Sequence, residues 1–431
     1  MSKTEAAAQE RERLESLAAR VGTPFWVIDA GVLRRRIGEV KAVCGECGFQ
    51  PRFAMKSLST WRVLQEMRDQ GIWIDAVSGN EVLRARRIGF PGGANPPVIM
   101  LTADVLRDNA LEVILNERVL VNIGSPGMLR ELEAAGYRGP VALRVNPGFG
   151  SGHSKGVDTG GPSSKHGVWF EDAGETAAEA ARRGLKIIML HAHIGSGPKL
   201  EELLANLNRL TQEFARMAKA FPDLEGFSLG GGIPFTYKED APPVEIAQLG
   251  PLFADARKRL CEAAGREVRV EIEPGRYFVA PAAHLVTRIR DIKSTRTNEK
   301  GTGKNFIMVD GGFVDLIRPA MYGSYHRISI VGRGATNPVE EFAVAGPVCE
   351  SGDVFTRGSS DLIAPRPLPR PEIGDLLVLH DGGAYGYVMA SNYNSVGRAP
   401  QVWLEEDGSA VLVSRRETLD DILKAEVEEK L

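Results

Sequence analysis

The strongest constraint on the fold is a pattern that the chain repeats eight times between residues 50 and 276. Each repeat is a short β-rich run, a polar or glycine-rich turn and a helical stretch. Alternating strands and helices are typical of a parallel sheet, and eight units over about 225 residues match a TIM-type (β/α)8 barrel. A doubly wound sheet is the structural alternative. The runs lie at residues 52–56, 72–78, 98–102, 119–123, 141–147, 186–194, 227–232 and 268–275.

Beyond residue 284 the chain reads as strands joined by turns, and Asp407-Gly408 between two alternating runs is a hairpin signal. The segment has no long helix before residues 419–431. The fold class expected is therefore α/β plus all-β. We predict an N-terminal segment at 1–30 whose strand joins the β domain, a barrel at 31–283, and a C-terminal β-sandwich or β-barrel at 284–431 with substrate and dimer contacts.

Two segments read as loops. Residues 148–167 contain seven glycines and follow the fifth strand, which suggests a mobile lid over a site. Residues 365–371, PRPLPRP, suggest a stiff polyproline connection.

Charge and composition exclude several classes of protein. Lys and Arg number 53 against 56 Asp and Glu, a net charge of −3, which argues against a nucleic-acid binder. The chain contains no apolar stretch of about 18 residues, so no membrane span is expected. The charged first 22 residues lack the apolar centre of a secretion signal, and four cysteines are too few for a disulfide scaffold. A cytoplasmic location is expected.

Polar groups and glycines follow most of the predicted barrel strands. Catalytic residues of (β/α)8 enzymes lie at the carboxyl ends of the strands, where a purely structural barrel needs only turn formers. Each group has an ordinary structural explanation, but together they favour an active site. The set is Lys56, Asp75, Ser78, Asn122, Arg144, His193, Gly230, Gly231, Gly232 and Glu273.

A metal site is the weaker interpretation. His191 and His193 lie on one face of a strand, as in some metal-dependent hydrolases. The chain has only seven histidines, however, and no second cluster that completes a three-ligand site. Cys44 and Cys47 form a CxxC without a partner pair. We therefore expect no metal.

A phosphate site is better supported. The glycine triplet at 230–232 and Gly275-Arg276 after the next strand can present backbone N–H groups and a guanidinium to an anion. His193 and Ser196 follow the strand before the triplet and add an imidazole and a hydroxyl.

Ordered motifs from residue 23 to residue 416 resemble those of the barrel-type (fold type III, alanine racemase-like) pyridoxal-phosphate amino-acid decarboxylases. Within this family the chain is most similar to the meso-diaminopimelate decarboxylases. The motifs are LRVNPGFG, TGGPSSKHG, HAHIGSG, SLGGG, EIEPGR, RPAMYGSYH, AGPVCESGD and GAYGYVMASNYNS.

The resemblance assigns roles in the barrel. Lys56 matches the lysine that bonds covalently to the aldehyde of pyridoxal 5′-phosphate, and Glu273 matches the carboxylate that faces the ring nitrogen. His193 matches the imidazole stacked on the ring. The remaining cofactor-binding residues expected are Asp75, Arg144, Ser196, Gly230, Gly231, Gly232, Gly275, Arg276 and Tyr385.

The resemblance also assigns residues of the C-terminal domain. Cys349 matches the acid that returns a proton after CO₂ leaves, on a loop that crosses a two-fold dimer interface, which implies a homodimer with shared active sites. A diaminopimelate pocket must hold both an ammonium and a carboxylate at the far end of the substrate. Arg318 suits that carboxylate and Glu350 that ammonium. The full substrate set expected is Arg276, Arg318, Tyr322, Glu350 and Tyr385.

The expected reaction is decarboxylation of meso-diaminopimelate to lysine, with three alternatives open. One is a decarboxylase of another carboxylate-tailed amino acid or of a D-amino acid. Another is an amino-acid racemase, but an acidic partner for the ring nitrogen argues against it. The third, a non-catalytic homologue, should have lost Lys56 or Cys349, and both are present.

Overall fold

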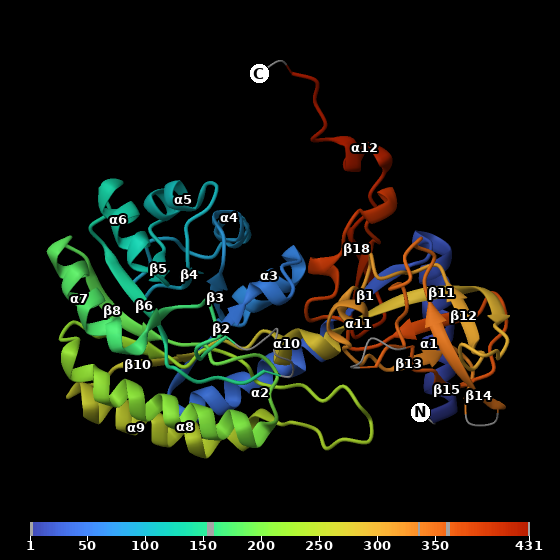
Figure 1. Cartoon of the computed structure of the whole chain (residues 1–431), viewed down its shortest axis with the longest axis horizontal. Coiled ribbons are helices and arrows are strands. Elements are labelled where there is room, and N and C mark those ends of the chain that lie inside the picture. Colours follow the sequence, from blue (N-terminus) through green and yellow to red (C-terminus); the bar gives the residue numbers. More distant parts are fainter. Residues whose placement is uncertain (1–2, 153–158, 335–336, 359–362, 430–431) are drawn as a thin grey trace. The chain divides into compact units, whose positions relative to one another are not determined.

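The computed structural model describes residues 3–152, 159–334, 337–358 and 363–429 (Figure 1). The chain forms two compact units. The first comprises Met1–Leu33, Thr236–Pro242 and Val279–Leu431, and the second Arg34–Phe235 and Pro243–Phe278. We refer to them as the sheet unit and the barrel unit.

The barrel unit contains a closed parallel barrel. Its strands follow the order β5-β4-β3-β2-β10-β9-β8-β6, and pairing of β5 with β6 closes the ring. This closure confirms the predicted barrel and excludes the doubly wound sheet. The barrel strands are β2 (Phe49–Ala54), β3 (Trp73–Ala76), β4 (Ile99–Ala103), β5 (Leu120–Ile123), β6 (Pro140–Asn146), β8 (Lys186–His191), β9 (Gly226–Ser228) and β10 (Arg269–Ile272), and the short β7 (Val168–Trp169) pairs with β6.

Helices surround the barrel strands in Figure 1. They are α2 (Ala30–Cys47), α3 (Trp61–Asp69), α4 (Gly79–Ile88), α5 (Ala110–Glu117), α6 (Pro126–Ala134), α7 (Ala173–Arg182), α8 (Leu200–Met217), α9 (Gly250–Ala264) and the single turn α10 (Arg276–Val279). In α8 the buried residues Leu203, Leu207, Leu210 and Phe214 recur at helical spacing, which gives the helix one apolar face.

Local signals set the ends of these helices. The Ser78 side chain accepts a hydrogen bond from the Glu81 amide and so caps α4, and Gly89 ends α4 in the left-handed conformation. Ser78, one of the polar groups after the predicted strands, therefore has a structural role as a helix cap.

The glycine-rich loop at 148–167 contacts the barrel through its described residues. The Ser151 amide donates to the Ile194 carbonyl at 2.7 Å, and the Thr159 hydroxyl donates to the His193 carbonyl at 2.8 Å. Residues 153–158 of the predicted lid lie outside the described residues.

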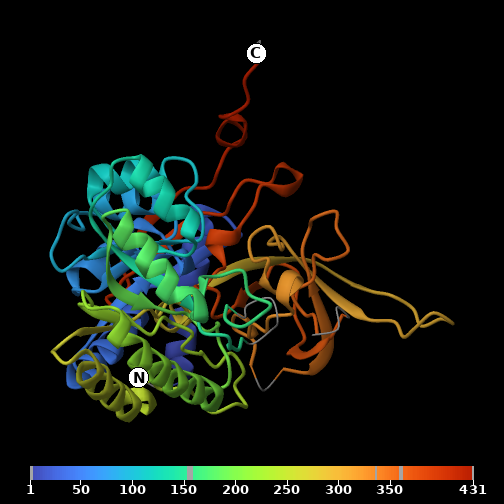
Figure 2. The same cartoon turned by 60° about the vertical axis from the view of Figure 1, so that its left-hand side comes forward.

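The sheet unit contains a mixed sheet of nine strands. β1 (Phe25–Asp29) pairs antiparallel with β11 (Ala283–Ser294) and parallel with β17 (Gln401–Leu404), so the N-terminal strand lies within this sheet. The other strands are β12 (Asn305–Val309), β13 (Ile328–Ile330), β14 (Val339–Ala345), β15 (Arg366–Pro369), β16 (Leu376–Leu379) and β18 (Ala410–Ser414). Figure 2 shows the connection between β11 and β12 extending away from the rest of this sheet.

Helices cover part of the sheet unit. Along α1 (Lys3–Val21), Leu14, Leu17 and Ala18 pack against Phe25 and Val402 in one apolar cluster. The two further helices are the short α11 (Arg318–Tyr322) and α12 (Leu419–Leu423). The sequence suggested a helix throughout 419–431, and within the described residues to 429 the helix is limited to α12.

The prediction of a polyproline connection at 365–371 is wrong. Arg366–Pro369 forms strand β15, which pairs antiparallel with β14 and lies at an edge of the sheet. Proline lacks an amide donor but is tolerated on an edge strand, and Pro367 and Pro369 both lie there.

Within the described residues, no helix is long and apolar enough to cross a membrane.

Candidate active site

The barrel site begins at the carboxyl end of β2. Lys56 lies in the 3-10 turn η1 (Met55–Ser57) directly after this strand, and its side chain is exposed. On the neighbouring strand β3, Asp75 is buried and accepts a hydrogen bond from the Thr102 hydroxyl at 2.6 Å. Burial and the Glu273 carboxylate raise the pKa of Asp75 to about 6, although the Lys56 ammonium opposes this effect.

Glu273 follows β10 and is the buried anion of the site. Its carboxylate accepts from the Ser228 hydroxyl at 2.6 Å and contacts His191 Nε2 at 2.9 Å. Burial alone would raise the pKa of Glu273, but His191, Ser228 and the Arg52 guanidinium together lower it to about 2. The side chain is therefore ionised at pH 7.

His193 is held as a neutral ring. The Gly231 amide donates to His193 Nδ1 at 3.1 Å, so the proton of the neutral imidazole is on Nε2. Burial and the charges of Lys56 and Arg144 lower the pKa of His193 well below its ordinary value. Arg144 on β6 is itself buried, which lowers its pKa, and the nearby Asp104 carboxylate opposes that effect.

The glycine triplet forms a crowded corner where the chain leaves β9. A Cβ at Gly230 would collide with the Ala192 carbonyl, and one at Gly231 with the Glu273 carbonyl. Gly230 and Gly232 also have left-handed φ angles of +68° and +96°. Only glycine therefore fits this corner.

Two of the three triplet amides are already used. The Gly230 amide donates to the Ser228 hydroxyl at 3.2 Å, and the Gly231 amide donates to His193. The Gly232 amide has no hydrogen-bond partner among the described residues. This amide is available to an anion.

Arg276 lies close to Ser196. Its guanidinium donates to the Ser196 hydroxyl at 3.2 Å, and the side chain is buried. Gly275, which precedes it, lies against the turn that carries Lys56, because a Cβ there would be 3.1 Å from Ser57 Oγ. The arginine, the hydroxyl and the glycine corner all belong to the barrel unit.

A second group of predicted residues lies in the sheet unit. Arg318 is buried at the start of α11, and its guanidinium lies 5.9 Å from the centre of the Tyr322 ring and 5.8 Å from that of Tyr385. The Ser324 hydroxyl accepts from Arg318 at 3.2 Å. Tyr385 has a left-handed φ of +62°. The structure thus brings Arg318, Tyr322 and Tyr385 together, as a cation beside two aromatic rings.

Cys349 and Glu350 lie on an exposed loop. The buried Asp353 shapes this loop, because its carboxylate accepts from the Val348 and Phe313 amides at 2.8 and 2.6 Å. Glu350 lines a small apolar cavity of about 260 Å³ beside Met321.

Neither histidine of the HxH pair is arranged as a metal ligand. His191 contacts Glu273, and His193 accepts from the Gly231 amide. In the part of the chain that the structure describes, no group of three or more His, Cys, Asp or Glu side chains could hold a metal ion.

Comparison with known proteins identifies the family. Residues 31–280 match the family "Pyridoxal-dependent decarboxylase, pyridoxal binding domain". The diaminopimelate decarboxylase of Escherichia coli K12 is 40% identical over 423 residues, 96% of each chain. A crystal structure of a diaminopimelate decarboxylase superposes with a TM-score of 0.88 at 40% identity over 96% of both chains. That of the Helicobacter pylori enzyme complexed with L-lysine gives 0.81 at 26% identity, over 95% of this chain and 98% of the other.

The chain belongs to the pyridoxal-dependent decarboxylases.

The cofactor of this decarboxylase is pyridoxal phosphate, and the barrel residues fit it. Such a cofactor needs a lysine, an anion for its protonated ring nitrogen and a compact anion-binding corner for its phosphate. Lys56, the ionised Glu273 and the glycine triplet supply these three elements within one unit. A Cβ at any of the three glycines would clash with a backbone carbonyl, of Ala192, Glu273 or Gly195, so the close approach of these chain segments depends on glycine.

Residues that sequence reasoning did not single out complete the decarboxylase site. Ser228 points into the barrel and connects the Gly230 amide to Glu273. Asp104 follows β4 and binds His166 Nδ1 at 2.6 Å and the Gly167 amide at 3.0 Å, which anchors the end of the glycine-rich loop. Ser228 lies in the SLGGG motif, so its position on the strand was a usable signal. Asp104 contacts His166 and Gly167, and Asp353 contacts Phe313, across separations in sequence that no motif records.

Proposed function

We propose that the chain decarboxylates meso-2,6-diaminopimelate to L-lysine and CO₂, a step of lysine biosynthesis. The observation that carries the reaction class is Glu273, a buried carboxylate kept anionic by Ser228 and His191 at the end of the barrel that carries Lys56. An anion at this position keeps the ring nitrogen of the cofactor protonated. The bound cofactor then supplies an electron sink for the electron pair released as CO₂ leaves.

The barrel residues hold the cofactor in this proposal. Lys56 would attach to it covalently, and the neutral His193 ring would contact it without competing with Glu273 for the ring nitrogen. Ser196, Arg276 and the Gly232 amide hold the phosphate. The Gly230 and Gly231 amides instead brace Ser228 and His193, so these two glycines position other groups.

Asp75 and Arg144 complete the barrel set as positioning residues. Asp75 belongs to a buried chain of hydrogen bonds, because the Asn122 amide donates to the Thr102 hydroxyl, which donates to Asp75. Arg144 balances the carboxylates of Asp75 and Glu273. Both residues set the charge around Lys56 and Glu273.

The substrate follows from the curated relative and from the charged residues of the sheet unit. Diaminopimelate carries an ammonium and a carboxylate at its far end. Arg318, buried beside Tyr322 and Tyr385, is a preorganised cation for that carboxylate, and Glu350 holds that ammonium. Simpler diamino acids bring no distal carboxylate to Arg318 and so lose that ion pair, at a cost of a few kcal/mol, where each 1.4 kcal/mol is about tenfold in preference.

Two copies of the chain share their active sites in this proposal. Cys349 is exposed on the loop that Asp353 shapes, which suits a proton donor that serves a neighbouring copy. We therefore propose a homodimer in which Cys349 of one copy serves the barrel of the other. A cytoplasmic location, expected from the sequence, stays a prediction.

A second candidate function is decarboxylation of another carboxylate-tailed amino acid, because Arg318 would recognise any distal carboxylate. Glu273 disfavours racemisation, since an anionic partner for the ring nitrogen delocalises the electrons away from the carbon that a racemase must reprotonate on either face.

Release of CO₂ from a panel of amino acids tests the proposal. We expect meso-diaminopimelate to be turned over at least tenfold faster, in kcat/KM, than L-lysine, L-ornithine, L-glutamate or D-lysine. Lys56→Ala should lose the activity, while Lys41→Ala, an exposed lysine of α2, should keep it. Faster turnover of L-lysine or L-ornithine would refute the substrate assignment, and racemisation without CO₂ release would refute the reaction class.

A further inference from the structure

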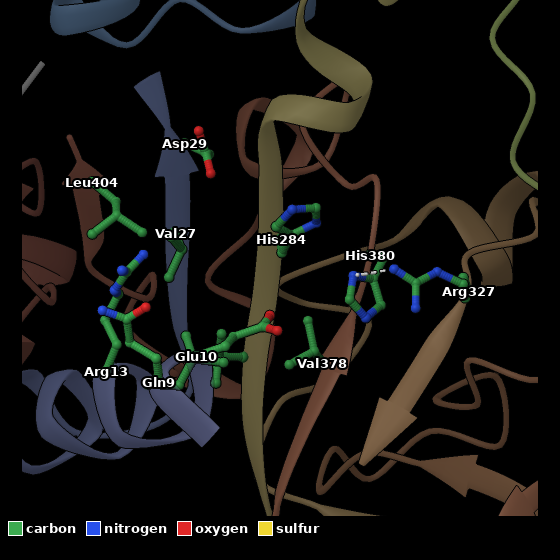
Figure 3. Close-up of a pocket in the computed structure, with 12 residues that line it drawn as sticks. Gln9, Glu10, Arg13, Val27, Asp29, His284, Arg327, Val378, His380 and Leu404 are labelled. Carbon is green, nitrogen blue, oxygen red and sulfur yellow. Dashed lines mark hydrogen bonds between the residues drawn. The ribbon is translucent and has the colours of Figure 1, made fainter. Parts of the chain in front are cut away.

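A second cavity lies within the sheet unit, separate from every residue assigned above. It encloses about 410 Å³ between α1 and the strands β1, β11 and β16, and Figure 3 shows its lining side chains. The wall is apolar where Val27, Val286 and Val378 belong to the cluster on which α1 packs. An aliphatic ligand chain would find a suitable surface here.

Two histidines on this wall are neutral and have fixed protons. Arg327 donates to His380 Nδ1 at 2.9 Å, so the proton of His380 is on Nε2, which donates to the Ser329 hydroxyl at 2.7 Å. The Asp381 amide donates to His284 Nδ1 at 3.1 Å, so His284 also has its proton on Nε2. Burial lowers the pKa of His284 to about 4 and that of His380 to about 2.

The neutral His284 leaves one donor for a ligand. Its Nε2–H has no hydrogen-bond partner among the described residues, and the ring lines the cavity. His380, by contrast, has both ring nitrogens occupied.

Three charged side chains on the cavity have polar atoms that make no hydrogen bond or ion pair among the described residues. Within the described ranges, neither Arg13 nor Glu10 on α1 makes a hydrogen bond or ion pair. Asp29 caps α2 with one carboxylate oxygen, which accepts from the Val32 amide at 2.8 Å. Its other oxygen makes no hydrogen bond or ion pair among those residues, and the Asp29 charge partly opposes the lowering of the pKa of His284 that burial causes. Figure 3 shows Asp29 and Glu10 on opposite sides of His284. Arg327 differs, because Glu239 lies 3.3 Å from it.

The unpartnered groups define the charge of a matching ligand. Arg13 contributes one positive charge and Glu10 and Asp29 two negative charges, so the sum is −1. A complementary ligand carries one carboxylate, two ammonium groups and an aliphatic chain between them. A dicarboxylate would meet one cation and two anions, and a fully apolar ligand would leave all three charges unpaired.

We propose that this cavity is a binding site for a diamino monocarboxylic acid of the lysine class. Arg13 and His284 Nε2–H bind the carboxylate, Asp29 and Glu10 bind the two ammonium groups, and the valine wall contacts the methylenes. A bound ligand would add to the apolar contacts that already hold α1 against the sheet. The site does not depend on the proposed function. Only the point that this ligand class includes the reaction product, lysine, rests on it.

Hydrogen exchange of the cofactor-loaded protein tests the site directly. L-lysine should slow exchange in peptides from 8–21 and 25–29, because the ligand bridges α1 and β1. Norleucine lacks the second ammonium, and cadaverine lacks the carboxylate. Each should need at least a tenfold higher concentration than lysine to give the same protection of these peptides. Equal protection by norleucine or cadaverine, or none by lysine, would overturn the proposal.

Matched variants separate this site from lysine bound elsewhere. Arg13→Gln and Asp29→Asn should each raise the lysine concentration for half-maximal protection at least tenfold, and asparagine retains the cap of α2. Glu12→Gln, on the exposed face of α1, should change nothing. Unchanged protection in both cavity variants would refute the site. Release of CO₂ from diaminopimelate by the same samples tests the proposed function independently, since neither variant belongs to the catalytic set.

Discussion

The substitution Asp75→Asn should stabilise the cofactor-free protein at neutral pH. The pKa of Asp75 rises from an ordinary value of 3.8 to about 6 in the fold, mainly through burial and Glu273. A difference of about 2 in pKa corresponds to about 3 kcal/mol that the ionised carboxylate costs the folded state. Asparagine removes this cost and can still accept a hydrogen bond from Thr102.

The sign of the pH dependence is fixed by the same values. Between pH 3.8 and pH 6 the folded chain keeps a proton that the unfolded chain has released, so stability falls as the pH rises and the cost is complete above pH 6. About 2 of the 3 kcal/mol arise between pH 4.5 and pH 7. Glu273 has the opposite effect, since its lowered pKa adds stability above pH 4.5 that is lost as the pH falls toward 2.

Urea unfolding of the cofactor-free protein, followed by circular dichroism at pH 4.5 and pH 7, measures this effect. The gain of Asp75→Asn over the wild type should be larger at pH 7 by about 2 kcal/mol. Asp223→Asn, an exposed carboxylate of the same unit, is the control and should show no such difference. A variant no more stable than the wild type at pH 7, or a gain equal at both pH values, would refute the reasoning.

Three further predictions concern function. Gly231→Ala places a methyl group against the Glu273 carbonyl, disturbs the amide that positions His193, and should weaken pyridoxal phosphate binding more than tenfold in a dialysis titration; unchanged affinity would mean that the geometry of this corner does not support cofactor binding. Mixed samples of inactive Lys56→Ala and Cys349→Ala should recover part of the wild-type activity, and no recovery would argue against shared sites. Glu350→Ala should raise KM for diaminopimelate at least tenfold with cofactor affinity unchanged, and an unaltered KM would exclude Glu350 from the pocket.

The barrel was predictable because its signal is local and repeated. Each predicted run overlaps a barrel strand, although the runs at 52–56 and 227–232 extend beyond the ends of β2 (Phe49–Ala54) and β9 (Gly226–Ser228). The error at 365–371 has a physical origin. Polyproline and edge-strand conformations are both extended, and only pairing with β14, from another part of the chain, distinguishes them.

The candidate site was predictable only in part, because residue type and strand position do not reveal cross-strand bonds. The glycine triplet was noticed as a source of amides for phosphate, yet two of its amides serve Ser228 and His193. Asp353 shapes the Cys349 loop through backbone amides of two different segments, which no local pattern records. Such contacts between distant segments become visible only in the folded chain.

Borohydride reduction of the cofactor-loaded protein, followed by peptide mass mapping, tests the central claim most directly. Reduction fixes the cofactor permanently on the lysine that carries it. The account predicts a single labelled peptide, with the added mass on Lys56, and no label in Lys56→Ala. A label on another lysine, or a fully active protein that carries no label, would contradict it.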